Sequence, residues 1–206
     1  MSLDKTIKNY TEENGYLPLF NYNNIQTIGD GNCWLRTLSL FFEGNQDNYK
    51  QYRKEVSEFC KDNKEELRKF FVQDVFNKND KVLENYTFDD YIENISKDYF
   101  YSGIIELLVS SQIYRINISI YVIENNIYYY YKRIACIGEN YNDEIKLSFT
   151  NNIHYSLLVS YKNPKININK NLKISNYKEK KKNELDTTKL SHKLDNLNID
   201  LNKLVI

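Results

Sequence analysis

Residues 29–42 read GDGNCWLRTLSLFF and join a tight turn to a helix. Glycine, aspartate and asparagine fill the first four positions, a composition typical of a turn. Apolar side chains then recur at Trp34, Leu38 and Phe41, which is the spacing of one face of an α-helix. The segment therefore predicts a buried helix that begins at Cys33, directly after the turn.

Cys33 is a candidate nucleophile because of this position. A free cysteine titrates near ~8.5, and the thiolate is the reactive form. A helix N-terminus favours the thiolate through its partial positive charge and unpaired N–H groups. Gly31 lets the backbone approach closely, so N–H groups of the turn could face an oxyanion. The alternative is a buried structural cysteine behind an ordinary Asp or Asn helix cap.

The chain has two histidines, His154 and His192. His192 falls in a polar C-terminal stretch, on a predicted helix whose apolar stripe excludes it. His154 opens a predicted strand of the globular part, so it is the candidate base for Cys33, although a lone strand histidine can also be structural. A cysteine at a helix start with a late strand histidine is the papain-like arrangement, in which the ion pair lowers the thiol pKa to ~3–4.

The rest of the globular part predicts helices followed by strands. Helical apolar spacing covers four more stretches, at residues 47–61, 64–77, 88–97 and 104–114. Alternating, β-branched stretches follow at 116–123, 127–133, 145–149 and 154–161. This order indicates an α+β domain with helices packed on a small, mostly antiparallel sheet.

Composition narrows the class of protein. The 28 basic and 28 acidic residues balance, so net charge gives no reason to expect nucleic acid or membrane binding. Cys33, Cys60 and Cys136 show no C-x-x-C spacing, so we expect reduced thiols and no metal site. No stretch reaches ~18 consecutive apolar residues, and the first twenty residues do not resemble a signal peptide. We expect an intracellular, cytoplasmic protein without a membrane span.

The turn and helix resemble the D-G-N-C-x-x-R-x-x-S signature of ovarian tumour (OTU) domain deubiquitinases. The resemblance continues in order and at sensible spacing over roughly residues 25–160. It takes in a second helix that contains Arg53, an F-x-x-Y-I segment, a run similar to W-G-G-x-x-E-L, an I-x-I-Y strand and an I-x-L strand before the final H-Y. These lie, in order, at residues 49–60, 88–95, 101–107, 118–121, and 145–147 with 154–156.

This resemblance implies a papain-like OTU fold and a cysteine protease mechanism. Cys33 would be the nucleophile and His154 the general base. Backbone N–H groups of the Asp30–Cys33 loop, with Gly31 and Asn32 as supporting residues, would form the oxyanion hole. The reaction would be hydrolysis of the bond after the C-terminal glycine of ubiquitin, through a thioester and without metal or cofactor. Ubiquitin, polyubiquitin or a ubiquitin-like modifier would be the partner.

The sequence departs from the family pattern at two places. Ser156 stands where the family usually has Asp or Asn, and it can accept a hydrogen bond but brings no charge to an imidazolium. Asp30 is then the best candidate for the acidic triad member, and holding the turn is its alternative role. The second departure is Tyr101-Ser102-Gly103 in place of W-G-G, which we interpret as core packing. For Arg36, capping or pairing near the helix is favoured over catalysis.

The resemblance divides the chain into an N-terminal extension (1–24), an OTU-like catalytic domain (25–162) and a Lys/Asn-rich linker with an amphipathic helix (163–206). That helix is predicted from a leucine stripe at Leu190, Leu194, Leu197, Leu201 and Leu204. It either docks on its own domain, giving the monomer we expect, or makes a dimer or binds a partner.

Two rival functions stay open. One is a catalytically inactive OTU-like module that binds ubiquitin. The other is nucleic-acid binding through the lysine run at 178–182, which Glu179 interrupts and which is more typical of a solvated stretch. A compact member of biased composition suits a host-directed effector of a virus, intracellular bacterium or parasite, acting in the host cytoplasm.

Overall fold

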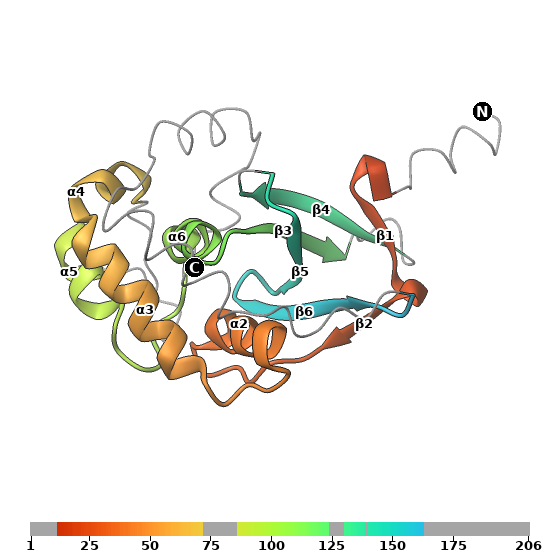
Figure 1. The fold of residues 1–206 in the computed structure, drawn as a ribbon, viewed down its shortest axis with the longest axis horizontal. Coiled ribbons are helices and arrows are strands. Elements are labelled where there is room, and N and C mark those ends of the chain that lie inside the picture. Colours follow the sequence, from red (N-terminus) through yellow and green to blue (C-terminus); the bar gives the residue numbers. More distant parts are fainter. Residues whose placement is uncertain (1–11, 72–85, 124–129, 139, 163–206) are drawn as a thin grey trace.

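The computed structural model describes residues 12–71, 86–123, 130–138 and 140–162, and its fold is α+β (Figure 1). The predicted C-terminal helix, the lysine run and His192 lie outside the described residues, as do positions 1–11 of the predicted N-terminal extension.

The helices lie where the apolar spacing predicts them. Within the described residues there are five α-helices and three short 3₁₀ turns. They are η1 (Glu12–Asn14), η2 (Leu19–Asn21), α2 (Cys33–Glu43), α3 (Tyr49–Asp62), α4 (Lys64–Leu67), η3 (Arg68–Phe70), α5 (Phe88–Asn94) and α6 (Ile104–Tyr114). The stretch predicted at 64–77 is helical only as far as Phe70, and its residues 72–77 lie outside the described part.

Six strands form one mixed sheet. They are β1 (Tyr16–Pro18), β2 (Tyr22–Ile25), β3 (Ile116–Ile123), β4 (Tyr130–Ile137), β5 (Asp143–Thr150) and β6 (His154–Ser160), in the spatial order β1-β4-β3-β5-β6-β2. All neighbouring pairs are antiparallel except β3 and β5. The predicted class, a mostly antiparallel sheet with helices packed on it, is confirmed.

Strands β1 and β2 were not predicted. They form the two edges of the sheet, β1 beside β4 and β2 beside β6. Both are short, and β2 contains two asparagines, a residue depleted in strands. The predicted boundary between residues 24 and 25 therefore passes through β2, and the segment that leads to the turn is part of the sheet.

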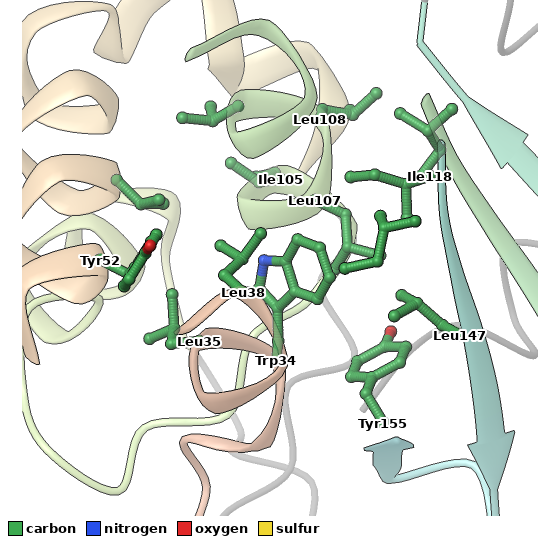
Figure 2. Close-up of a cluster of buried hydrophobic side chains, with 14 of the residues drawn as sticks. Trp34, Leu35, Leu38, Tyr52, Ile105, Leu107, Leu108, Ile118, Leu147 and Tyr155 are labelled. Atoms are coloured by element: carbon green, nitrogen blue, oxygen red, sulfur yellow. The ribbon is translucent and has the colours of Figure 1, made fainter. Parts of the chain in front are cut away.

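The core lies where α2 and α6 meet the sheet. In Figure 2, Trp34 and Leu38 of α2 lie between Ile105 and Leu107 of α6 and the strand residues. Trp34 packs edge-on against Tyr155 with ring centroids 6.3 Å apart, and its Nε1–H donates to Ser110 Oγ at 3.2 Å. Burying one such aromatic or aliphatic side chain contributes about 1.5–3 kcal/mol, so the start of α2 is firmly anchored to β6.

None of the described helices is long and apolar enough to cross a membrane.

Candidate active site

Cys33 is the first residue of α2 and lies against the beginning of β6. Its Sγ is 3.9 Å from the carbonyl oxygen of Ile153, which is 120 positions later and directly precedes His154. Cys33 is only 2% exposed. Since α2 packs directly on β6 (Figure 1), the structure brings the start of the helix to the start of the strand. The two residues of the predicted pair therefore lie in the same part of the fold.

The turn before Cys33 requires a glycine at position 31. Gly31 has φ of 79°, a left-handed conformation. A Cβ built there would lie 2.6 Å from the carbonyl carbon of Tyr99, closer than real Cβ atoms approach other atoms. The loop before α6 thus presses directly on the turn, and only a residue without a side chain fits.

Asp30 is occupied by contacts within the turn and helix. Its Oδ1 accepts the backbone N–H of Asn32 at 3.0 Å, and its Oδ2 pairs with Arg36 Nη2 at 2.6 Å. Burial opposes ionisation of Asp30, but the hydrogen bonds from Arg36 and Asn32 outweigh it and lower the pKa of the carboxyl. The pairing expected for Arg36 is confirmed. The structure does not bring Asp30 into a hydrogen bond with His154, and holding the turn accounts for its contacts.

Arg53 of α3 holds the same turn from the other side. Its guanidinium donates to Asn32 Oδ1 at 3.0 and 2.6 Å and to the carbonyl of Gly31 at 3.2 Å. It also reaches the carbonyls of Ile95 at 2.9 Å and Phe100 at 2.8 Å. One buried cation therefore ties the turn to the segment between α5 and α6.

His154 is half-buried at the first position of β6. Its Nε2 lies 3.4 Å from Thr27 Oγ1. A Cβ built on Gly29 would lie 3.8 Å from its Nδ1, so the backbone of Gly29 runs beside the ring. The imidazole is thus placed between β6 and the segment that connects β2 to the turn.

Ser156 follows two residues later on β6 and is fully buried. Its hydroxyl donates to Gln26 Oε1 at 3.1 Å. Among the described residues, neither Ser156 nor Asp30 makes a hydrogen bond to the imidazole. Both candidates for orienting His154 have other partners.

Burial shifts the pKa values of Cys33 and His154 in the directions opposite to those that an ion pair would give. Burial raises the pKa of the Cys33 thiol, although nearby backbone N–H groups of Tyr155 and Trp34 oppose the shift. Burial likewise lowers the pKa of His154, and a backbone hydrogen bond with Thr27 opposes that shift. Both shifts favour the neutral form of the group concerned. For the Cys33 thiol, loss of water outweighs the backbone N–H groups.

Three large apolar side chains are exposed in segments that adjoin the turn or His154. Ile28 is 55% exposed, Tyr99 67% and Ile153 38%. They come from the turn segment, from the loop that packs on Gly31 and from the residue before His154. A contiguous apolar patch on a surface commonly marks a place where a partner binds, whereas single exposed apolar residues are ordinary.

Thr27 and Gln26 were not predicted from the sequence. They follow β2, and the polar composition of β2 concealed that this segment pairs with β6. The register of that pair, with Ile25 opposite Leu157, brings residues 26 and 27 beside residues 154–156. Only the pairing of β2 with β6 would have pointed to Thr27 and Gln26 as neighbours of His154.

The described residues contain no group of three or more His, Cys, Asp or Glu side chains that could hold a metal ion.

A family model described as "OTU-like cysteine protease" matches residues 28–159, which is more than half of the chain. The chain belongs to this family. The match begins at the turn segment and ends in β6, so it includes Cys33 and His154. The family suggested by the D-G-N-C segment is confirmed.

Individual relatives agree with this assignment. Over 97 residues the chain is 31% identical to the ovarian tumor domain-containing deubiquitinating enzyme 7 of Arabidopsis thaliana, a match covering 47% of this chain and 23% of that protein. The chain thus spans about a quarter of the length of that relative.

Solved structures show the same fold. The OTU domain protease of Taggert virus aligns with a TM-score of 0.55 and 18% identity, over 75% of this chain and 94% of its own. The Hazara virus OTU bound to ubiquitin aligns with a TM-score of 0.52 and 14% identity, over 70% and 86%.

Proposed function

We propose that this chain is a deubiquitinase that hydrolyses the isopeptide or peptide bond after the C-terminal glycine of ubiquitin. Cys33 is the nucleophile and His154 the general base in this proposal. The observation that carries it is the position of the Cys33 thiol, 3.9 Å from the carbonyl of the residue before His154, behind a turn that is held rigidly. The Hazara virus neighbour, an OTU bound to ubiquitin, supports ubiquitin as the partner.

The first step is attack by Cys33 Sγ on the carbonyl carbon of the last glycine of ubiquitin. Because burial raises the pKa of the thiol, His154 takes its proton as the S–C bond forms. Within the turn, the Asp30 N–H already donates to the carbonyl of Ile28 and the Asn32 N–H to the Asp30 carboxylate. We therefore assign the oxyanion to the N–H groups of Gly31 and Cys33, with Asn32 supporting the turn through Arg53.

The second half of the reaction regenerates the enzyme. His154 returns the proton to the leaving amine, which departs and leaves ubiquitin joined to Cys33 as a thioester. His154 then takes a proton from water, whose oxygen attacks the thioester carbonyl. The ubiquitin carboxylate is released, and the thiol recovers its proton. Atoms balance without a metal or redox cofactor.

Asp30 has a supporting role in this proposal. Its ion pair with Arg36 fixes the turn that carries the proposed oxyanion donors. We assign the exposed side chains of Ile28, Tyr99 and Ile153 to contact with the incoming ubiquitin tail.

A ubiquitin probe with a C-terminal electrophile tests the proposal. We expect a covalent adduct with the unmodified protein, no adduct with Cys33→Ala, and a greatly reduced rate with His154→Ala, which removes the base. Cys136→Ala is the matched control because Cys136 is a half-buried thiol of β4, away from the turn. Its adduct should form at the normal rate. Labelling that survives Cys33→Ala would refute the assignment.

An inactive ubiquitin-binding module is the second candidate, favoured by one observation: Cys33 is only 2% exposed, and this burial raises the pKa of its thiol. In that case Cys33→Ala would bind ubiquitin normally while the unmodified protein would form no adduct. If the unmodified protein does form the adduct, a panel of the eight diubiquitin linkages, together with probes made from ubiquitin-like modifiers, would define the substrate. Action in a host cytoplasm stays a prediction by analogy.

A further inference from the structure

Thr27 is the polar side chain that hydrogen-bonds the imidazole of His154. It lies directly after β2 and is 7% exposed. Its Oγ1 donates to the carbonyl oxygen of Tyr155 at 2.6 Å and lies 3.4 Å from His154 Nε2. A threonine hydroxyl has one proton and two acceptor lone pairs. With the proton committed to Tyr155, Oγ1 can only accept a hydrogen bond from the imidazole.

This arrangement selects one form of the neutral ring. If Oγ1 accepts at Nε2, that nitrogen carries the proton and Nδ1 is left with its lone pair. Nδ1 is the nitrogen beside Gly29, toward the turn that precedes Cys33. The tautomer that Thr27 stabilises is thus one whose basic nitrogen lies on the side of the turn.

The other side chains considered for this role are committed elsewhere. The Asp30 carboxylate pairs with Arg36, and the Ser156 hydroxyl donates to Gln26. Thr27 is also held firmly, since the segment that contains it is fixed by the pairing of β2 with β6. A side chain that is buried and bonded to the strand of His154 itself moves with that strand.

We propose that Thr27 is the positioning residue of this site: its hydroxyl accepts the Nε2–H of His154 and keeps Nδ1 free to take the proton of Cys33. The catalytic part of this inference rests on the proposed function. The tautomer of His154, by contrast, can be measured in the free protein without a substrate. In cysteine proteases a carboxylate or an amide orients the histidine. In this protein the Thr27 hydroxyl has that role. At 3.4 Å the bond is long, and it tightens when the ring becomes charged during turnover.

The test uses the full chain labelled with ¹⁵N-histidine. Only His154 and His192 contribute imidazole signals, so the spectrum is simple. Thr27→Val removes the hydroxyl with little change of shape, and Thr27→Ser is the matched control that keeps it. We expect the Nε2–H tautomer of His154 in the unmodified protein and in Thr27→Ser at pH 8, and a mixture of tautomers in Thr27→Val.

Kinetics with a ubiquitin substrate complete the test. Losing one neutral hydrogen bond corresponds to about a tenfold change in rate. Thr27→Val should therefore lower kcat about tenfold with KM unchanged, whereas Thr27→Ser stays within about twofold of the unmodified protein.

Each outcome is decisive. An Nδ1–H tautomer in the unmodified protein would overturn the inference even if Thr27→Val fails to fold. An unchanged tautomer in a folded Thr27→Val would overturn it as well. If the unmodified protein cleaves no ubiquitin, the proposed function fails, while the tautomer still decides the role of Thr27.

Discussion

Replacing Arg53 with methionine should destabilise the whole domain. Methionine has a similar length but no donors, and the substitution leaves four acceptors without their partner: Asn32 Oδ1 and the carbonyls of Gly31, Ile95 and Phe100. Each buried acceptor left unpaired costs about 1–3 kcal/mol. Arg53 itself lines a surface pocket with Ser57 and Ser96, so the loss should be smaller than the sum of four fully enclosed acceptors. We therefore expect a loss of about 3–5 kcal/mol, the range measured when one partner of a buried charged contact is removed.

Urea unfolding followed by tyrosine and tryptophan fluorescence would measure this loss. The free energy of unfolding of a domain is about 5–15 kcal/mol, so the expected change is a large fraction of the total. Lys54→Met is the matched control. Lys54 is the next residue of α3, its side chain is 67% exposed, and it pairs only loosely with Glu58 at 3.9 Å. Loss of such an exposed i,i+4 pair changes stability by about 0.3–0.5 kcal/mol.

The result also bears on the site. Because Arg53 fixes Asn32 and the Gly31 carbonyl, Arg53→Met should slow labelling of Cys33 by the ubiquitin probe even under conditions where the variant is fully folded. Arg53→Lys keeps the charge but not the planar, forked guanidinium group. Its stability and its labelling rate should therefore lie between those of Arg53→Met and the unmodified protein. A destabilisation below about 1 kcal/mol for Arg53→Met would refute the argument that this guanidinium holds the turn.

The same contacts lead to four further predictions. Gly31→Ala should abolish probe labelling and lower the thermal midpoint of unfolding, because Tyr99 and the positive φ leave no room for a Cβ. Gly44→Ala is the control, since Gly44 also has a positive φ but lies at the other end of α2. It should destabilise the protein without abolishing labelling. Asp30→Ala should slow turnover far more than Ser156→Ala, since only Asp30 pairs with Arg36; similar rates would contradict this. The acid limb of kcat/KM should lie below pH 6.5, because burial lowers the pKa of His154 and keeps the base neutral there. Because of the same shift, the unfolded state binds more protons than the folded state as pH drops below about 6.5, so the stability that His154 contributes falls there. His154→Gln should remove that part of the pH dependence of the free energy of unfolding.

Long elements with regular apolar spacing could be predicted from the sequence. α2, α3, α5 and α6 and the central strands β3, β5 and β6 have enough buried side chains to give a clear period. The turn before Cys33 was also clear, since glycine, aspartate and asparagine mark it. Cys33 and His154 could be found because few residues of either type compete for the role.

The contacts around the imidazole could not be predicted. They depend on the pairing of β2 with β6, which joins residues far apart in sequence through a short strand of two polar residues, one aromatic and one aliphatic. The sequence also did not determine the partner of Asp30. A carboxylate in a turn can contact either a histidine or an arginine of the following helix, and the path of the backbone decides which of the two it contacts. The pKa of the thiol is raised by burial against the beginning of β6. No local sequence pattern around Cys33 predicts this contact.

The two sides of the site are held by different kinds of contact, and this bears on how the reaction proceeds. Charged groups fix the turn through Asp30 with Arg36 and through Arg53, whereas neutral hydrogen bonds hold the imidazole. With the pKa of the thiol raised and that of the imidazole lowered, moving a proton from Cys33 to His154 is unfavourable on its own. The transfer becomes favourable once the negative charge passes from sulfur to the carbonyl oxygen of the substrate, where fixed N–H groups can stabilise it. Proton transfer and attack should therefore occur together, and the rigid turn has to supply the stabilisation that a preformed ion pair would otherwise provide.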